Sequence, residues 1–214
     1  MCGRIVQSFD LERVGQYFDI QQGAESIAWV EPSYNIAPSS RIYALRLNEN
    51  KDKAWTTFKW GMLPAWAKMK RPVINVRAET VTQKPMFRNA FRSRRSVIPV
   101  TAYYEWQAIP GGKQPHCIRS KNGIPLLLAG LYTENECVIL TRSAQRDISF
   151  IHDRMPVVVD PDILDAYLNQ PDIACEVIGR EDPLDLEVYP VTKKIGNPAL
   201  DHPVCLKPLD RAQL

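Results

Sequence analysis

Cys2 carries the most distinctive chemistry in this sequence, because it directly follows Met1. Removal of Met1 would place a free α-amine and a thiol on neighbouring carbons, with ordinary pKa values of about 8 and about 8.5. Such a pair suits an aldehyde, because the amine condenses to an imine and the sulfur then closes a thiazolidine ring. The alternative is a small buried Cys without chemistry, which is common for free Cys. At position 2, followed by Gly3 and Arg4, we favour the chemical interpretation.

Glu105 is a candidate acid–base residue because it stands among aromatic rings in a strand-like stretch. The alternation of a strand places Glu105 on one face with Tyr103 and Gln107, and Trp106 on the other. An acid hemmed in by rings is desolvated, and desolvation raises its pKa toward the range of general acid–base catalysis. The alternative is an outward-facing Glu on an exposed strand.

Two further polar residues could serve the same chemistry. Asn75 precedes Arg77 at a predicted junction between strand and helix, where Asn is as often a helix cap as a site residue. His152 lies among polar neighbours, and His exchanges protons near neutral pH, although a lone His is more often structural. The other two His residues, His116 and His202, adjoin Pro or Cys, and we interpret both as structural.

The stretch 60–66 places Trp60 and Trp66 on either side of Gly61 and Pro64. Such a loop is rigid, and it either wedges outward or lines the core. On local sequence we favour the core-lining interpretation.

The elements that position these residues are mostly strands, with short helices inserted. Strands are predicted over 5–7, 41–47, 54–60, 95–100, 102–107, 114–119, 125–131, 137–141, 156–159 and 187–192. Helices are predicted over 11–17, 77–83, 85–93 and 161–169. This order predicts an α+β fold with a curved, largely antiparallel sheet, in one domain over residues 1–214.

Composition excludes several classes of protein. The chain has 45% hydrophobic and 24% charged residues, as in ordinary globular proteins. Its five Cys follow no paired spacing, so we expect no metal site and a reducing compartment. The longest apolar run, 126–131, is too short to span a bilayer, and no secretory signal is apparent. No phosphate-binding Gly-rich loop or GxSxG motif occurs, so we expect no cofactor.

The same observations predict a cytoplasmic or nucleoid-associated protein, with no membrane partner. We further expect a monomer.

The basic residues gather in one stretch. Residues 68–95 hold nine Lys and Arg against one acid, Glu79, although the net charge is only +3. A one-signed segment of this kind suggests a polyanion partner, the alternative being a solvated helical face. Aromatic rings near this stretch favour single-stranded nucleic acid, although several will be core: Trp60, Trp66, Phe87, Phe91, Tyr103, Tyr104 and Trp106.

In order and spacing, several islands of the chain resemble the SOS-response-associated peptidase (SRAP) family of abasic-site processing proteins. The islands cover 1–4, 34–38, 60–67, 75–80, 99–106, 129–131 and 152–156. The resemblance implies a single α+β domain around a curved, barrel-like β core with inserted helices. It also implies a covalent crosslink to abasic sites in single-stranded DNA. Residues 193–214 match least clearly and form a C-terminal extension to which we assign no role.

The resemblance also assigns roles at the reaction centre. Cys2 resembles the nucleophile exposed by removal of Met1, and Asn75 and Glu105 resemble its polar neighbours. His152 resembles the second acid–base residue. We expect Glu105 to move protons, Asn75 to orient the α-amine, and His152 to act near the sugar oxygen or the leaving phosphate. Lyase activity and self-removal of Met1 are secondary expectations.

The remaining assignments concern DNA. Arg4 and Arg77 resemble the family's phosphate contacts, and Trp66 and Trp106 resemble the residues that shape the DNA groove. We add Arg88 as a phosphate contact, since guanidinium groups bind phosphates in a forked geometry.

Two alternatives to a crosslinking protein stay open. One is an N-terminal-nucleophile amidohydrolase, such as a glutaminase domain, in which the Cys2 thiol attacks an amide. The other is a non-covalent binder of single-stranded DNA, in which Cys2 plays no part in DNA retention.

Overall fold

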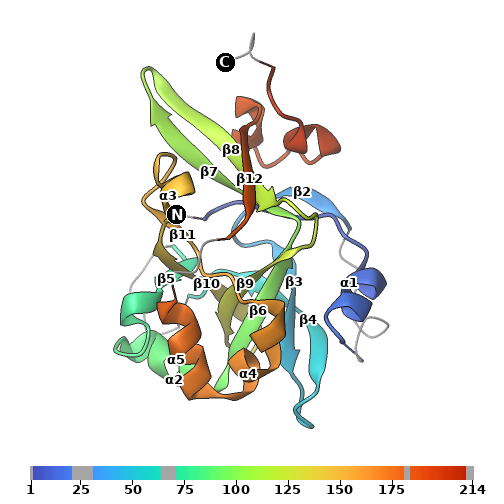
Figure 1. Ribbon diagram of the computed structural model, residues 1–214, viewed down its shortest axis with the longest axis vertical. Coiled ribbons are helices and arrows are strands. Elements are labelled where there is room, and N and C mark those ends of the chain that lie inside the picture. Colours follow the sequence, from blue (N-terminus) through green and yellow to red (C-terminus); the bar gives the residue numbers. More distant parts are fainter. Residues whose placement is uncertain (1, 21–30, 64–70, 181–183, 211–214) are drawn as a thin grey trace.

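The computed structural model describes residues 2–20, 31–63, 71–180 and 184–210. Its strands form two sheets, which lie one above the other in Figure 1. The smaller sheet is antiparallel and has the order β12 (Leu186–Pro190), β8 (Gly112–Ser120), β7 (Ala102–Ile109), β1 (Ile5–Gln7) and β2 (Ser33–Ile36). Strand β7 presents Tyr103 and Tyr104 to different hydrophobic clusters, so both faces of this sheet are covered.

The larger sheet is ring-like. Its strands are β11 (Arg154–Pro156), β10 (Glu136–Ser143), β4 (Lys53–Trp60), β3 (Arg41–Leu47), β6 (Arg95–Val100) and β9 (Leu126–Tyr132), with β5 (Asn75–Arg77) beside β10. Strand β9 also pairs with β10, so β10, β4, β3, β6 and β9 close on themselves. Most pairs are antiparallel, while β4 and β5 run parallel to β10. The predicted α+β class with a curved, largely antiparallel β core is confirmed.

Short helices cover the strands. They are α1 (Leu11–Tyr17), α2 (Pro85–Ser93), α3 (Arg146–Ser149), α4 (Leu164–Asn169) and α5 (Pro171–Gly179). Helix α1 begins as the sequence predicts, because the Asp10 side chain accepts a hydrogen bond from the Arg13 amide at 3.0 Å. No helix in the described part of the chain is long and apolar enough to cross a membrane.

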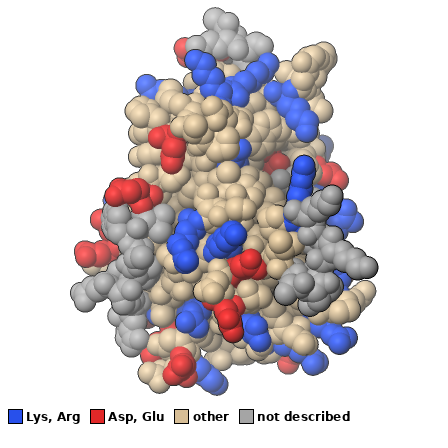
Figure 2. Space-filling view, turned by 180° about the vertical axis from the view of Figure 1, so that it is seen from behind, with Lys and Arg blue, Asp and Glu red and all other residues tan. Residues whose placement is uncertain are grey.

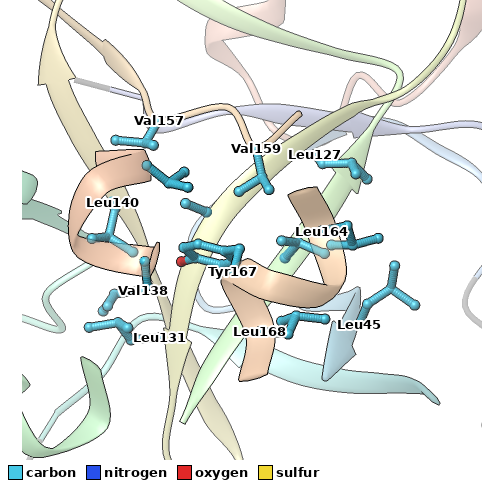
Figure 3. Packing of buried hydrophobic residues seen from close by; sticks show 14 of the residues in the cluster. Leu45, Leu127, Leu131, Val138, Leu140, Val157, Val159, Leu164, Tyr167 and Leu168 are labelled. Carbon is cyan, nitrogen blue, oxygen red and sulfur yellow. The ribbon is translucent and has the colours of Figure 1, made fainter. Parts of the chain in front are cut away.

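A hydrophobic cluster joins the ring of strands to α2, α4 and α5. In Figure 3, Tyr167 of α4 lies toward Leu131 of β9 and Val138 and Leu140 of β10, whereas Leu168 lies on the side of Leu45 of β3. Full burial of such a side chain stabilises the fold by about 1.5–3 kcal/mol. Gly130 of β9 leaves no room for a side chain, because a Cβ there would lie 2.4 Å from Cδ1 of Ile98 on β6. This packing holds β10, and with it β5, in a fixed position.

Several predicted elements are wrong or displaced. The helix predicted over 77–83 is absent, because Arg77 ends β5 and only the 3₁₀ turn η1 (Ala78–Thr80) follows. The strand predicted over 156–159 lies earlier, at β11, and Val158 makes only an isolated bridge with Leu128. The helix predicted over 161–169 divides into the turn η2 (Pro161–Ile163) and α4.

The C-terminal segment is tied firmly to the smaller sheet. Two 3₁₀ turns, η3 (Lys193–Gly196) and η4 (Pro203–Leu206), follow β12. The buried Asn35 of β2 donates from Nδ2 to the carbonyl oxygen of Leu200 at 2.7 Å. Asp201 accepts a hydrogen bond from Ser33 Oγ at 2.7 Å. The described residues of this segment are therefore part of the fold rather than a loose extension.

Candidate functional site

Cys2 lies beside β7, at the point where the chain enters β1. The Tyr104 amide donates to the Arg4 carbonyl at 3.0 Å, and Ile5 pairs with Tyr103, so the antiparallel register carries Cys2 toward Glu105. Cys2 is fully buried. Burial and the negative charge of Glu105 raise the pKa of its thiol. The sulfur is therefore protonated at neutral pH and needs a base before it can act as a nucleophile.

Asn75 holds the backbone of Cys2. Its Nδ2 donates a hydrogen bond to the Cys2 carbonyl oxygen at 2.7 Å. Asn75 itself is fixed because β5 pairs with β10 at Ile139. The helix-cap interpretation is wrong, since η1 begins after Arg77 and has no side-chain cap. Among the described residues, Asn75 Oδ1 is buried without a hydrogen-bond partner, so this oxygen can accept a further hydrogen bond at the site.

Glu105 is buried, with only 2% of its surface exposed, so the interpretation as an outward-facing residue is wrong. The predicted alternation holds: Tyr103 packs in the same cluster as Cys2, whereas Trp106 packs on the other face. Burial raises the pKa of Glu105 to about 7, and the charge of Asp153 acts in the same direction. A carboxyl with this pKa is divided between acid and base forms at neutral pH, as proton transfer in both directions requires.

His152 lies between α3 and β11, with its side chain 28% exposed. The Arg154 amide donates to its Nδ1 at 3.0 Å, and Asp153 Oδ1 lies 2.8 Å from the same atom. Burial lowers the pKa of His152, while Asp153 opposes that change. The ring is therefore largely neutral at pH 7, with Nδ1 accepting the hydrogen bond from the Arg154 amide.

Glu79 and Arg154 form an ion pair that sequence reasoning missed. Arg154 donates to both Glu79 carboxylate oxygens, at 2.6 and 2.9 Å, and to the Thr141 carbonyl at 2.6 Å. Glu79 follows β5 and Arg154 follows His152, so the pair links the segments that carry Asn75 and His152. The sequence does offer a signal for this pair, because Glu79 lies in the island 75–80, Arg154 lies in the island 152–156, and the two side chains have opposite charges.

Arg4 is buried and has internal partners. Its guanidinium donates to Asn35 Oδ1 at 2.6 Å and to the Ile195 carbonyl at 2.7 Å. It also lies 5.9 Å from the ring centroid of Trp106. Arg4 therefore joins β1 to the C-terminal segment, and its role as a phosphate contact stays a prediction.

The described basic residues of the stretch 68–95 have different environments in the structure. Arg77 and Arg88 are exposed, and Arg77 borders a groove lined by Asn75, Lys84 and Met86. Arg95 is buried instead and donates to the Tyr167 carbonyl at 2.6 Å. Arg95 therefore stabilises the fold through its hydrogen bonds and does not add positive charge to the surface. On the face shown in Figure 2, basic and acidic side chains are interspersed.

Most of the aromatic rings near this stretch are core residues. The expectation that they stack on bases is wrong for Trp60, Phe87, Phe91, Tyr103 and Tyr104, all of which are buried. The core-lining interpretation of Trp60 is confirmed, because its Nε1 donates to the Ile74 carbonyl at 3.1 Å.

The structure describes only one of the two Trp residues assigned to the DNA groove. Trp106 is partly exposed and packs with the cluster around Tyr104. Trp66 lies outside the described residues.

Comparisons with known proteins identify the family and the fold of this chain. The model of the family described as "SOS response associated peptidase (SRAP)" matches residues 1–198. A Bacillus subtilis relative, abasic site processing protein YoaM, is 33% identical over 92% of this chain and 94% of its own length. A crystal structure from Bacteroides thetaiotaomicron superposes with a TM-score of 0.79 at 19% identity, over 97% of this chain and all of its own.

A phage-related protein from Bordetella bronchiseptica has a TM-score of 0.73 at 26% identity, over 90% of this chain and 95% of its own. The structures agree in fold, and the family model covers every residue of the site around Cys2, from Asn75 through Glu105 to His152. The chain belongs to the SRAP family.

Proposed function

We propose that this protein processes abasic sites in single-stranded DNA by forming a covalent thiazolidine crosslink through Cys2. The observation that carries the proposal is the hydrogen bond between Asn75 and the Cys2 carbonyl, which fixes Cys2 beside a buried Glu105 with a pKa of about 7. The name of the Bacillus subtilis relative, abasic site processing protein, supports the choice of substrate.

The first step is imine formation. Without its base, a deoxyribose opens to an aldehyde at C1′, and no base has to be flipped out of a stack. The Cys2 α-amine, exposed after removal of Met1, adds to C1′ and gives a carbinolamine. Protonated Glu105 donates a proton to the departing hydroxyl, which leaves as water, and a protonated imine remains beside the ionised carboxylate.

The second step is ring closure by sulfur. Ionised Glu105 takes the proton of the Cys2 thiol, the sulfur bonds to C1′, and the electron pair of the C=N bond moves to the protonated nitrogen, which becomes the neutral ring amine. The whole reaction joins protein and DNA with loss of one water. The thiazolidine removes the imine that would otherwise promote loss of the 3′ phosphate by β-elimination, so the strand is protected.

The remaining residues position these groups. Asn75 orients Cys2 through its carbonyl, and Asn75 Oδ1 accepts a hydrogen bond from the α-amine. His152 Nε2 exchanges a proton with the sugar oxygen or the leaving phosphate. Arg77 and Arg88 contact phosphates on the two sides of the abasic nucleotide.

Removal of Met1 must precede the crosslink. The family description names a peptidase, and self-removal of Met1 is the peptidase reaction that this site would perform. In that reaction the Cys2 thiol attacks the Met1 carbonyl, the peptide bond breaks to free the α-amine, and water hydrolyses the resulting thioester.

A denaturing gel tests the proposal. The protein is incubated with a single-stranded oligonucleotide that carries one abasic site, and the expected result is a shifted band that survives denaturation. Cys2→Ala should abolish this band. Cys2→Ser should allow imine formation and strand cleavage without a stable crosslink. Cys175→Ala is the matched control, because Cys175 is an exposed thiol among the described residues.

The outcomes separate the alternatives. No shifted band with the parent protein contradicts the proposal. Equal DNA retention by the parent and Cys2→Ala indicates a non-covalent binder. Release of ammonia from glutamine that depends on Cys2, without any crosslink, indicates an amidohydrolase.

A further inference from the structure

Phe150 is an exposed aromatic residue beside the candidate site. Its side chain is 57% exposed, whereas its neighbours Ile148 and Ile151 are buried in the cluster that contains Cys2. These two anchors fix the segment between α3 and β11 and direct Phe150 outward. His152 follows two residues later, so this ring lies at the rim of the site.

The ring of Phe150 is also held by a neighbour. Its centroid lies 6.1 Å from that of His116, and the two planes meet at 87°. His116 on β8 is the cross-strand partner of Glu105 on β7, so both project from the same face of the sheet. Near-perpendicular packing of two rings is a favourable arrangement, so His116 holds the Phe150 ring in place. Because the Phe150 side chain is also 57% exposed, it is a positioned ring that stays accessible from outside.

We propose that Phe150 stacks on the nucleobase next to the abasic nucleotide. The inference rests on the proposed function and extends it to the substrate beyond the reacting sugar. A base beside an abasic position has lost one stacking neighbour, and an aromatic side chain can replace that neighbour. Every base has such a face, so the contact recognises single-stranded DNA without selecting a sequence.

Local charge favours stacking over phosphate attraction at this rim. Charged side chains near Phe150 and His152 have both signs: Arg146, Asp147 and Asp153 are exposed neighbours in sequence, and the charge of Lys113 acts on the pKa of His152. The charges around Phe150 are therefore mixed rather than uniformly basic, which gives a polyanion little net attraction to the ring itself. The contribution of Phe150 to DNA binding should therefore be independent of salt, unlike that of an Arg contact.

Three variants test the inference on the full chain. Phe150→Ala removes the ring, Phe150→Trp retains a stacking surface, and Tyr17→Ala is the control. Tyr17 is also 57% exposed but lies on α1, at the other side of the molecule from α3 in Figure 1. The measured quantity is the oligonucleotide concentration that gives half the maximal crosslinking rate.

The expected effect is a selective loss of affinity. Phe150→Ala should raise this concentration about 5- to 150-fold, the range found when a base–aromatic stack is removed. Phe150→Trp and Tyr17→Ala should match the parent. When both bases beside the abasic site are replaced by tetrahydrofuran residues, Phe150→Ala and the parent should become equal.

A fluorescent base separates this inference from the proposed function. With 2-aminopurine beside the abasic site, binding by the parent should quench its fluorescence, and Phe150→Ala should lose the quenching. An unchanged concentration dependence in Phe150→Ala overturns the inference, as does a loss that persists without neighbouring bases. If the parent quenches the fluorescence but forms no crosslink, the stacking inference stands and the proposed covalent function fails.

Discussion

Asn75 and Cys2 are joined by a hydrogen bond of 2.7 Å, from the Asn75 side chain to the Cys2 carbonyl oxygen. The two residues are 73 positions apart in sequence, and the bond connects β5 to the segment that leads into β1. Since β5 is held by β10 of the ring, the position of Cys2 depends on the larger sheet as well as on the smaller one. The reaction centre therefore lies where the two sheets meet.

Asn75→Asp should slow crosslinking, because it removes the Nδ2 donor with little change in shape. We expect a rate roughly 10- to 100-fold lower from the misplaced Cys2 backbone. Stability should fall by about 1 kcal/mol, the usual net value of one hydrogen bond. Single-turnover crosslinking and urea unfolding measure the two effects. Asn50→Asp, at an exposed turn between β3 and β4, is the control. Equal crosslinking rates in Asn75→Asp and the parent would remove the assigned role.

Glu105→Gln should change the pH dependence of crosslinking. In the parent, the rate should change across pH 7, since the Glu105 pKa is about 7 and both of its protonation states take part. The amide cannot exchange a proton, so this pH dependence should disappear and the rate should fall. Crosslinking rates measured from pH 5 to 9 test this expectation. An inflection near pH 7 that persists in Glu105→Gln contradicts it.

Glu105→Gln should also stabilise the fold at high pH. The folded pKa of about 7 lies above the ordinary unfolded value, so the native state binds the extra proton between those two pKa values. The free energy of unfolding of the parent therefore falls as pH rises from about 4.5 to about 7, and then levels off. At pH 8 the Gln variant should be more stable by up to roughly 3 kcal/mol.

Urea unfolding at pH 4.5 and pH 8 measures this difference. Glu49→Gln, at an exposed position in the turn between β3 and β4, is the control and should show no such change. A Glu105→Gln variant that gains nothing at pH 8 would show that the carboxyl is not desolvated.

Asn35→Ala should destabilise the protein strongly. The change removes the Oδ1 acceptor of Arg4 and the Nδ2 donor to the Leu200 carbonyl, so the buried Arg4 cation loses its side-chain hydrogen-bond acceptor. We expect a loss of roughly 2–4 kcal/mol. Urea unfolding gives the value, and Asn197→Ala on the exposed turn is the control. A loss below about 0.5 kcal/mol, the usual range for surface changes, would contradict the role assigned to the C-terminal segment.

The exposed and buried Arg residues should respond differently to substitution. Arg77→Ala and Arg88→Ala should each weaken DNA binding and reduce the slope of log K against log salt by about 0.7, the value for one phosphate contact on a single strand. Arg95→Ala should instead reduce stability, because Arg95 bonds the Tyr167 carbonyl within the core. Binding assays across a salt series test this, with Arg13→Ala on α1 as the control. An unchanged slope in Arg77→Ala contradicts its assignment.

Local patterns in the sequence predicted part of this architecture. The strands at β3 and β4, the helix at α1 and the alternation around Glu105 are set by neighbouring residues, and these predictions are confirmed. Strand β5 was predicted only as a junction between strand and helix, with the helix starting at Arg77, because its parallel pairing with β10 cannot be seen in local sequence. Helix α5 was missed, although Pro171 at its first turn is a known signal.

The site was predictable in its residues but not in its contacts. Cys2, Asn75 and Glu105 could be chosen by type, yet the bond from Asn75 to the Cys2 carbonyl depends on two sheets meeting in space. The pair of Glu79 and Arg154 was missed for the same reason, since these residues are 75 positions apart. The burial of Arg95 was also not predicted. A run of like charges is typical of an exposed surface, and the local sequence does not show that one member of the run packs inside the fold.

Intact-mass spectrometry of the protein after incubation with an abasic oligonucleotide tests the central claim most directly. The account predicts free protein lacking Met1, together with an adduct equal to that protein plus the oligonucleotide minus one water. Digestion should place the adduct on the N-terminal peptide at Cys2. An adduct on a chain that retains Met1, or one attached to any residue other than Cys2, would contradict the account.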